Sequence, residues 1–140
     1  MSKKNIENYI PKAIKAIEKI FEEEIKNGSI PNEYKGYISS FGASLIQSGL
    51  KPTLALFEKD KEDYLKAQKD SLKEEKSFKY KIILIILETK NISADSLLRY
   101  VIEEEEKNHK SERGLKEDIK DLSIAIKLAI RTFKFKDKKD

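Results

Sequence analysis

The chain has 140 residues, which is enough length for one domain with an ordinary hydrophobic core, and its formal net charge is +4. It contains no cysteine, which excludes disulfide bonds and thiolate metal sites, and its N-terminal sequence lacks the apolar stretch of a signal peptide. The longest apolar run, residues 82–87, is far too short to span a bilayer. We therefore expect a soluble, cytoplasmic protein with no membrane association.

The N-terminal residues predict one long amphipathic helix. Apolar residues recur at three- and four-residue spacing from Ile6 to Phe21, which indicates a helix over about residues 2–26. The Asn-Gly-Ser sequence at 27–29 is a stop signal. Pro31 stands near the start of a second helix, where its missing N–H has no cost.

The second predicted helix contains a segment without charge, residues 36–50, although 39% of the chain is Asp, Glu, Lys or Arg. Its larger side chains follow helical spacing and predict an inward face, namely Tyr34, Tyr37, Ile38, Phe41, Leu45 and Ile46. Gly42 costs about 1 kcal/mol relative to Ala inside a helix, which predicts a close backbone contact there. We expect solvent to be excluded on nearly every side. The segment is either a central core helix or a core helix whose small residues, with Ser40 and Ala43 among them, also meet a partner subunit.

The middle of the chain combines a polar and an apolar segment. A short third helix is predicted from Pro52 to Phe57, and the polar residues 58–77 predict a solvated helix or a mobile connection. Residues 82–87 are apolar throughout, a pattern shared by buried strands and buried helices. Because no other segment offers a pairing strand, and an unpaired strand would leave backbone groups without hydrogen bonds, we predict a buried helix.

Two further helices complete the predicted fold. Ser93 is predicted to cap a helix that ends at about residue 107, and the last helix is predicted over about residues 115–134. A second apolar line on the last helix indicates either further packing within the chain or a partner subunit, and it consists of Ile124, Leu128 and Phe135. The sequence thus predicts an all-α fold, a single compact domain of about six helices over residues 1–140.

Few residues could support catalysis. His109 is the only histidine and lies in a polar turn, with no second histidine and no cysteine to complete a metal site. Consecutive carboxylates within the acidic runs at 22–24 and 103–106 would point in different directions on a helix, so these runs predict solvated faces. No glycine-rich phosphate loop is present. We therefore expect no enzyme activity, no metal and no other cofactor.

Two basic stripes predict contacts with a nucleic-acid backbone. The candidate residues are Lys12, Lys15 and Lys19 on the first helix and Lys127, Arg131 and Lys134 on the last. Neighbours on such a stripe are about 5–6 Å apart at Cβ, close enough to contact successive phosphates. Lysine and arginine would contact phosphates here without reading bases. For the first stripe, salt bridges to Glu18 and Glu22 on the same helix are an equal alternative.

Residues 37–57 carry a pattern that resembles one known family. The sequence is YISSFGASLIQSGL at 37–50 followed by KPTLALF at 51–57, and IPKAI at 10–14 with Ile-Pro at 30–31 and Tyr34 extends the likeness. The chain is similar to the small helical subunit of the type III-B (Cmr) CRISPR effector complex. The likeness is good over roughly residues 5–60. In the C-terminal helix, family members tend to carry Trp followed by Lys-Arg, where this chain has IRTFK at 130–134.

The resemblance implies a non-catalytic subunit of an RNA-guided ribonucleoprotein that acts in antiviral defence. Copies would stack head to tail in a filament, contact the other subunits of the complex, and support the backbones of guide RNA and target RNA. Cutting of target RNA would belong to other subunits. The alternative is a free-standing helical adaptor that binds a protein partner without nucleic-acid contact. Salt dependence would separate the two, because phosphate contacts weaken steeply with salt.

Overall fold

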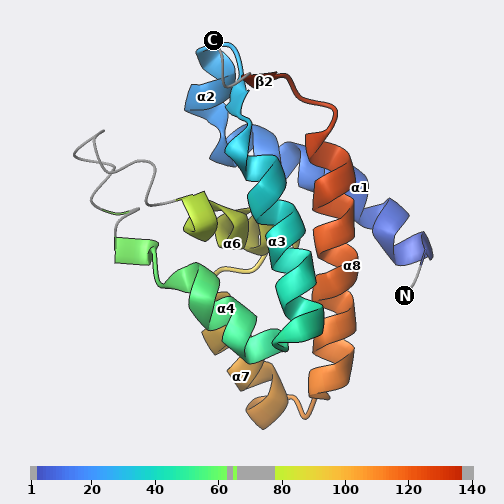
Figure 1. Ribbon diagram of the computed structural model, residues 1–140. Helices are drawn as coiled ribbons and strands as arrows, with labels where there is room; N and C mark the ends of the chain where they lie inside the picture. The colour runs from blue at the N-terminus through green and yellow to red at the C-terminus, as the bar shows by residue number, and fades with distance from the viewer. Residues whose placement is uncertain (1–2, 63–64, 66–77, 137–140) are drawn as a thin grey trace.

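Seven α-helices make up most of the computed structural model, which describes residues 3–62, 65 and 78–136 (Figure 1). In chain order the elements are α1 (Lys3–Ile20), α2 (Glu22–Lys26), β1 (Ile30–Pro31), α3 (Glu33–Gln47), α4 (Leu50–Glu58), α6 (Phe78–Thr89), α7 (Leu97–Lys107), α8 (Glu112–Ile130) and β2 (Phe135–Lys136). The predicted all-α fold is confirmed. Most of the polar connection predicted at residues 58–77 lies outside the described residues.

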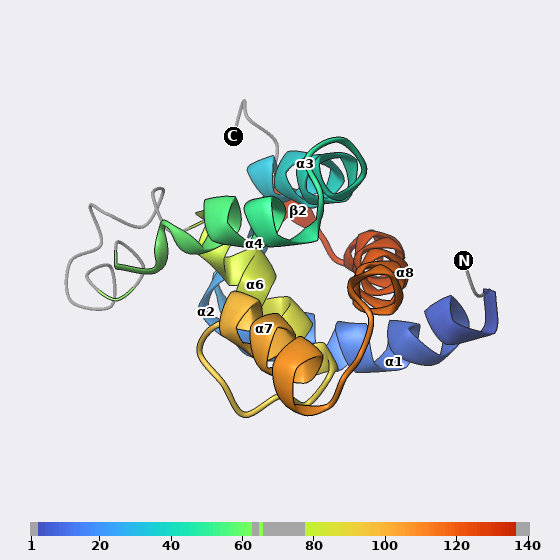
Figure 2. The ribbon, with the colours of Figure 1, turned by 90° about the horizontal axis from the view of Figure 1, so that it is seen from below.

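The helices pack around α6. Figure 2 shows α3 and α4 on one side of the domain and α1 on the opposite side, with α6 between them. Helix α8 packs against both α1 and α3 and closes the domain along one edge. The prediction of a buried helix at residues 82–87 is confirmed, with only Leu84 half-buried, because α1, α3, α4 and α8 all contact α6.

Aromatic side chains join α3 to its neighbours in the core. The ring centroids of Tyr34 and Phe21 are 4.4 Å apart, and those of Phe41 and Phe57 are 5.0 Å apart, both in edge-to-face geometry. Together with Ile38, these residues are buried, as the helical spacing predicts. Such pairs contribute about 0.5–1.5 kcal/mol each beyond the apolar area that they bury.

The outer face of α3 differs from the prediction. Ile46 is 64% exposed rather than buried, and Ser40 and Ala43 are also exposed. The expectation that solvent is excluded on nearly every side is therefore wrong for the single chain, because α3 lies at the surface of the domain. The close backbone contact predicted at Gly42 is also absent. A Cβ atom built there would meet the Ser123 Oγ at 3.8 Å, an ordinary van der Waals distance.

Several helix ends differ from the predicted ones. The first predicted helix is divided at Phe21 into α1 and α2, which accounts for the additional helix. Ser96, not Ser93, caps α7, since its side chain accepts a hydrogen bond of 3.1 Å from the Arg99 amide. Helix α8 ends at Ile130, four residues before the predicted end, and the chain then forms the parallel pair β1–β2. These two short strands were not predicted from the sequence.

Candidate nucleic-acid and subunit interfaces

The basic stripe on α1 lines a groove in the described part of the chain. Lys12, Lys15 and Lys19 are all exposed and share a groove of about 730 Å³ with the end of α6. We call it the α1/α6 groove. Its other lining residues are Tyr9, Ala16, Glu88, Thr89, Lys90 and Asn91. Helical spacing predicted that the three lysines share a side, whereas the contribution of α6 depends on tertiary packing and was missed.

Charge in the α1/α6 groove is only partly balanced. The Lys19 Nζ lies 2.9 Å from the Glu88 Oε1 on α6, so its partner comes from another helix rather than from Glu18 or Glu22. Within the described residues, Lys12 and Lys15 form no ion pair. The groove therefore offers two uncompensated ammonium groups and a third whose partner is solvent-exposed.

The C-terminal basic residues do not extend this groove. Lys127 is exposed on α8 and lines a different groove, between α3 and α8. Arg131 and Lys134 are exposed too, but Arg131 is the C-cap of α8, and Lys134 lies beyond the helix and does not continue its spacing. The Lys134 carbonyl accepts a 2.9 Å hydrogen bond from the Ile30 amide. The α1/α6 groove and the groove at Lys127 have no lining residue in common, so Lys127 does not share a groove with the stripe on α1.

The predicted interface residues fall into two places. We call the hollow between α3 and α8, about 190 Å³ in volume, the α3/α8 groove. It is lined by Ile38, Ser39, Gly42, Ala43, Ile46, Lys120, Ser123, Ile124 and Lys127. Leu128 is 42% exposed on α8, and Ser40 is exposed on α3. Phe135 does not belong to this surface, because it lies beyond the helix in β2, where the Lys35 Nζ is 4.2 Å from its ring centroid.

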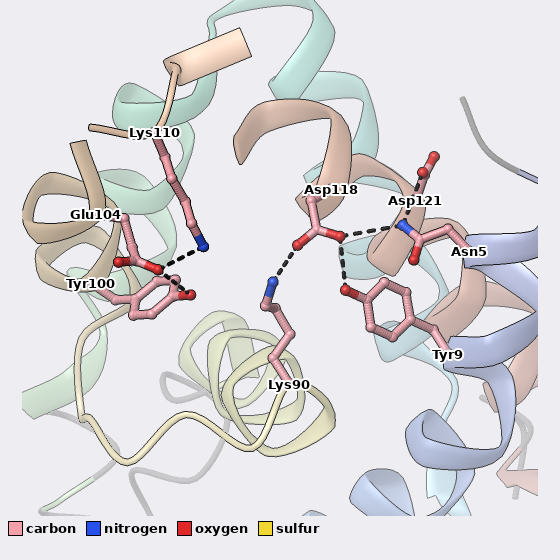
Figure 3. Close-up of polar contacts among 8 residues, drawn as sticks. All are labelled: Asn5, Tyr9, Lys90, Tyr100, Glu104, Lys110, Asp118 and Asp121. Carbon is pink, nitrogen blue, oxygen red and sulfur yellow. Dashed lines mark hydrogen bonds and ion pairs between the residues drawn. The ribbon is translucent and has the colours of Figure 1, made fainter. Parts of the chain in front are cut away.

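A polar cluster fixes α1 against α6 and α8. Figure 3 shows the Asp118 carboxylate between Lys90, the residue directly after α6, on one side and Tyr9 and Asn5 of α1 on the other. The Tyr9 hydroxyl donates to it at 2.7 Å, and the Asn5 amide at 3.3 Å. Burial opposes ionisation of Asp118, but the hydrogen bonds from Lys90 and Tyr9 outweigh it and hold the pKa of Asp118 below its ordinary value. The cluster thereby positions the wall of the α1/α6 groove.

The carboxylates of the acidic run at residues 103–106 have separate partners within the chain. Glu104 is buried rather than solvated and accepts hydrogen bonds from Asn108, from the Lys110 Nζ at 3.0 Å and from the Tyr100 hydroxyl at 3.0 Å (Figure 3). The bonds from Asn108 and Lys110 lower the pKa of Glu104 to about 2. The Glu105 Oε1 instead lies 3.0 Å from the Lys51 Nζ. These carboxylates therefore act as structural partners of different side chains rather than as one ligand set.

Residues 7–125 match the family described as CRISPR-associated protein (Cas_Cmr5). The chain belongs to this family. Its membership confirms the resemblance to the small helical subunit of the type III-B CRISPR complex. No significant match was found among curated proteins or among solved structures.

The Cas_Cmr5 match begins within α1 at residue 7, includes all of α3 and α6, and ends within α8 at residue 125. Both grooves therefore lie largely within the matched residues, whereas Arg131, Lys134 and Phe135 lie beyond them. His109 is exposed in the turn between α7 and α8, as predicted. None of the helices in the described part combines the length and the hydropathy of a membrane span.

Proposed function

We propose that the chain is a non-catalytic subunit of a type III-B CRISPR ribonucleoprotein in antiviral defence, where it stacks in a filament and supports the backbones of guide and target RNA. Family membership supports its place among CRISPR-associated subunits. The observation that carries the RNA contact is the α1/α6 groove, in which the exposed Lys12 and Lys15 have no acidic partner among the described residues.

The chemistry of the α1/α6 groove suits a phosphate backbone. Lys12 and Lys15 could approach phosphates without first breaking an ion pair. The exposed pair between Lys19 and Glu88 is of a kind that contributes about 0–1 kcal/mol, so Lys19 could exchange Glu88 for a phosphate at little cost. Lysine on an exposed stem acts as a point charge and does not require a base sequence. The groove thus supports a general backbone contact.

The C-terminal basic residues are a second, separate contact in this proposal. Lys127, Arg131 and Lys134 are exposed and free to meet phosphates, but they lie away from the α1/α6 groove. The filament contact is assigned to Ser40, Ala43, Ile124 and Leu128. We leave Phe135 out of this set, because it is half-buried and packs on the chain's own core.

Charge reversal in the assembled complex tests the RNA contact. One variant combines Lys12→Glu, Lys15→Glu and Lys19→Glu, and a second combines Lys127→Glu, Arg131→Glu and Lys134→Glu. A matched control reverses three exposed lysines outside both grooves, Lys3, Lys4 and Lys59. Target-RNA affinity is measured across a salt series with guide RNA loaded, and incorporation of each variant is quantified.

The α1 variant is expected to lose affinity and to show a shallower salt dependence, by roughly one counterion for each phosphate contact removed. The control is expected to behave like the wild type. If the incorporated α1 variant binds target RNA as the wild type does at every salt concentration, the α1/α6 groove is not an RNA contact.

A free-standing protein adaptor is the second candidate, because the uncharged outer face of α3 is exposed. In that case neither charge reversal changes RNA binding, and binding to the protein partner hardly responds to salt.

A further inference from the structure

The outer face of α3 is an uncharged, exposed surface on a strongly charged chain. Ile46 is 64% exposed and Leu128 of α8 is 42% exposed, while no residue from 36 to 50 carries a charge. Single exposed apolar residues are common in soluble proteins. Here, however, Ile46 lines a hollow, the α3/α8 groove, whose lining is mainly apolar or small. Because Gly42 has no side chain, this hollow stays open at its centre.

Charge at the edge of the α3/α8 groove selects its occupant. Lys120 and Lys127 line it, and none of the described residues in its lining is acidic. Two identical grooves could not face each other without bringing these lysines together, which disfavours a symmetric pair. An RNA backbone would have to cover the apolar side chains of Ile38, Ile46 and Ile124. The groove instead fits an apolar side chain flanked by carboxylates.

The chain itself carries such a surface at the junction of α1 and α2. The backbone bends at Phe21, whose φ of −104° and ψ of 26° are not helical, and the Ile25 amide donates to the Phe21 carbonyl at 2.9 Å in the first turn of α2. Glu22 and Ile25 share one side of α2, at positions i and i+3, and Glu18 lies in the last turn of α1, four residues before Glu22. Ile25 is 37% exposed, and both glutamates are exposed and form no ion pair within the described residues. We call these three residues the acidic stripe.

The other acidic run is a poorer partner. Three of the four carboxylates at residues 103–106 already pair within the chain, Glu103 with Lys107, Glu104 with Lys110 and Glu105 with Lys51. Binding through that run would exchange existing ion pairs rather than add new ones. The acidic stripe has no such cost.

We propose that the α3/α8 groove of one copy binds the acidic stripe of a second copy, with Ile25 in the hollow and Glu18 and Glu22 beside Lys120 and Lys127. The two surfaces share no residue, and α2 lies at one end of the domain whereas α3 and α8 run side by side away from it (Figures 1 and 2). Contact between two different surfaces leaves one of each free, so a further copy can add. The inference rests on the proposed filament and specifies which surfaces form it.

Disulfide trapping tests this contact directly, because the chain has no cysteine of its own. Ala43→Cys places a thiol in the groove, and Ile25→Cys places one on the acidic stripe. The two full-length variants are mixed without RNA or other subunits and oxidised. A disulfide needs Cα atoms about 4.4–6.8 Å apart, so only a close approach yields a cross-linked dimer. Ala94→Cys, at an exposed alanine outside both surfaces, is the matched control for Ala43→Cys.

The expected result is a dimer from Ala43→Cys with Ile25→Cys, in clear excess over each variant alone and over Ala94→Cys with Ile25→Cys. A dimer formed mainly by Ala43→Cys alone would show symmetric pairing and overturn the proposal. Cross-linking no greater than that of the control would also overturn it. Since RNA is absent, this outcome is independent of whether the α1/α6 groove contacts RNA.

Charge reversal then tests the orientation. Lys120→Glu with Lys127→Glu in the groove copy, or Glu18→Lys with Glu22→Lys in the stripe copy, is expected to abolish the cross-link. Mixing the two reversed copies is expected to restore it, a rescue that misfolded variants could not give. If the cross-link is unaffected by either reversal, the charges do not orient the contact. If groove reversal leaves the cross-link intact, the proposal is wrong whether or not RNA binding changes, because Lys127 is also a candidate RNA contact.

Discussion

Replacing Gly42 with alanine is expected to stabilise the protein. Glycine in a helix interior is about 0.8–1.0 kcal/mol less favourable than alanine, because it gives the unfolded chain more freedom to lose. The new Cβ would meet only the Ser123 Oγ, at 3.8 Å, so the structure adds no steric cost to offset this gain. We therefore expect the free energy of unfolding to rise by about 0.5–1 kcal/mol.

Thermal unfolding followed by far-ultraviolet circular dichroism measures this effect. For a domain of this size the gain corresponds to a rise in Tm of about 2–5 °C. Gly36→Ala is a positive control, because nothing lies within 4 Å of the new Cβ. Gly49→Ala is a negative control, because Gly49 has φ of 96°, a conformation that costs a residue with a side chain about 1–2 kcal/mol. A lower Tm for Gly42→Ala beside a higher Tm for Gly36→Ala would refute the reasoning and restore the close contact predicted from sequence.

Two polar clusters give further predictions. Because the pKa of Glu104 is lowered from 4.5 to about 2, its stabilising contribution is complete above about pH 4.5 and is lost as pH falls toward 2. Glu104→Gln should therefore flatten the fall in stability across this range, as urea unfolding at a series of pH values would show. Asp118→Ala should destabilise the fold by about 1–3 kcal/mol, since it leaves Lys90 and the Tyr9 hydroxyl without their acceptor. If Asp118→Ala unfolds at the same urea concentration as the wild type, the cluster does not hold α1 in place.

Local spacing was sufficient to predict much of this fold. The inward face of α3 and the common side of Lys12, Lys15 and Lys19 follow from helical geometry alone. The helix at residues 82–87 followed from the lack of any strand to pair with it. These inferences need no knowledge of where one helix lies relative to another.

The errors arise where tertiary packing decides. Helical spacing assigned Ile46 to the inward face together with Leu45, but it could not show that the packing of the domain buries Leu45 and leaves Ile46 exposed. Phe135 was assigned to the last helix, whereas the chain leaves α8 at Ile130 and turns back to pair with β1. Asp118 was missed because its partners on α1 are more than a hundred residues away, and no local pattern links them.

The acidic stripe lies next to the basic stripe, which couples the two proposed contacts. Glu18 follows Lys15 by three residues on α1, so these two lie on neighbouring positions of the helix surface, and Glu22 begins α2 only three residues after Lys19. A phosphate bound by these lysines would lie within about one Debye length of both carboxylates and would be repelled by them. Lys120 and Lys127 of a docked copy would neutralise that repulsion. Stacking should therefore strengthen RNA binding.

Glu18→Gln combined with Glu22→Gln separates these effects, because it should act in opposite directions on the two contacts. A unit charge about 8 Å away contributes about 0.5 kcal/mol in water, so the isolated variant should bind single-stranded RNA about two- to fivefold more tightly at low salt. The same variant should form less of the Ala43–Ile25 cross-link. Fluorescence anisotropy across a salt series measures the first effect, which should disappear at high salt as screening increases. In the assembled complex the gain should be absent, because the carboxylates are already covered there. An equal gain in the isolated chain and in the complex would show that no lysine of a neighbouring copy covers the acidic stripe.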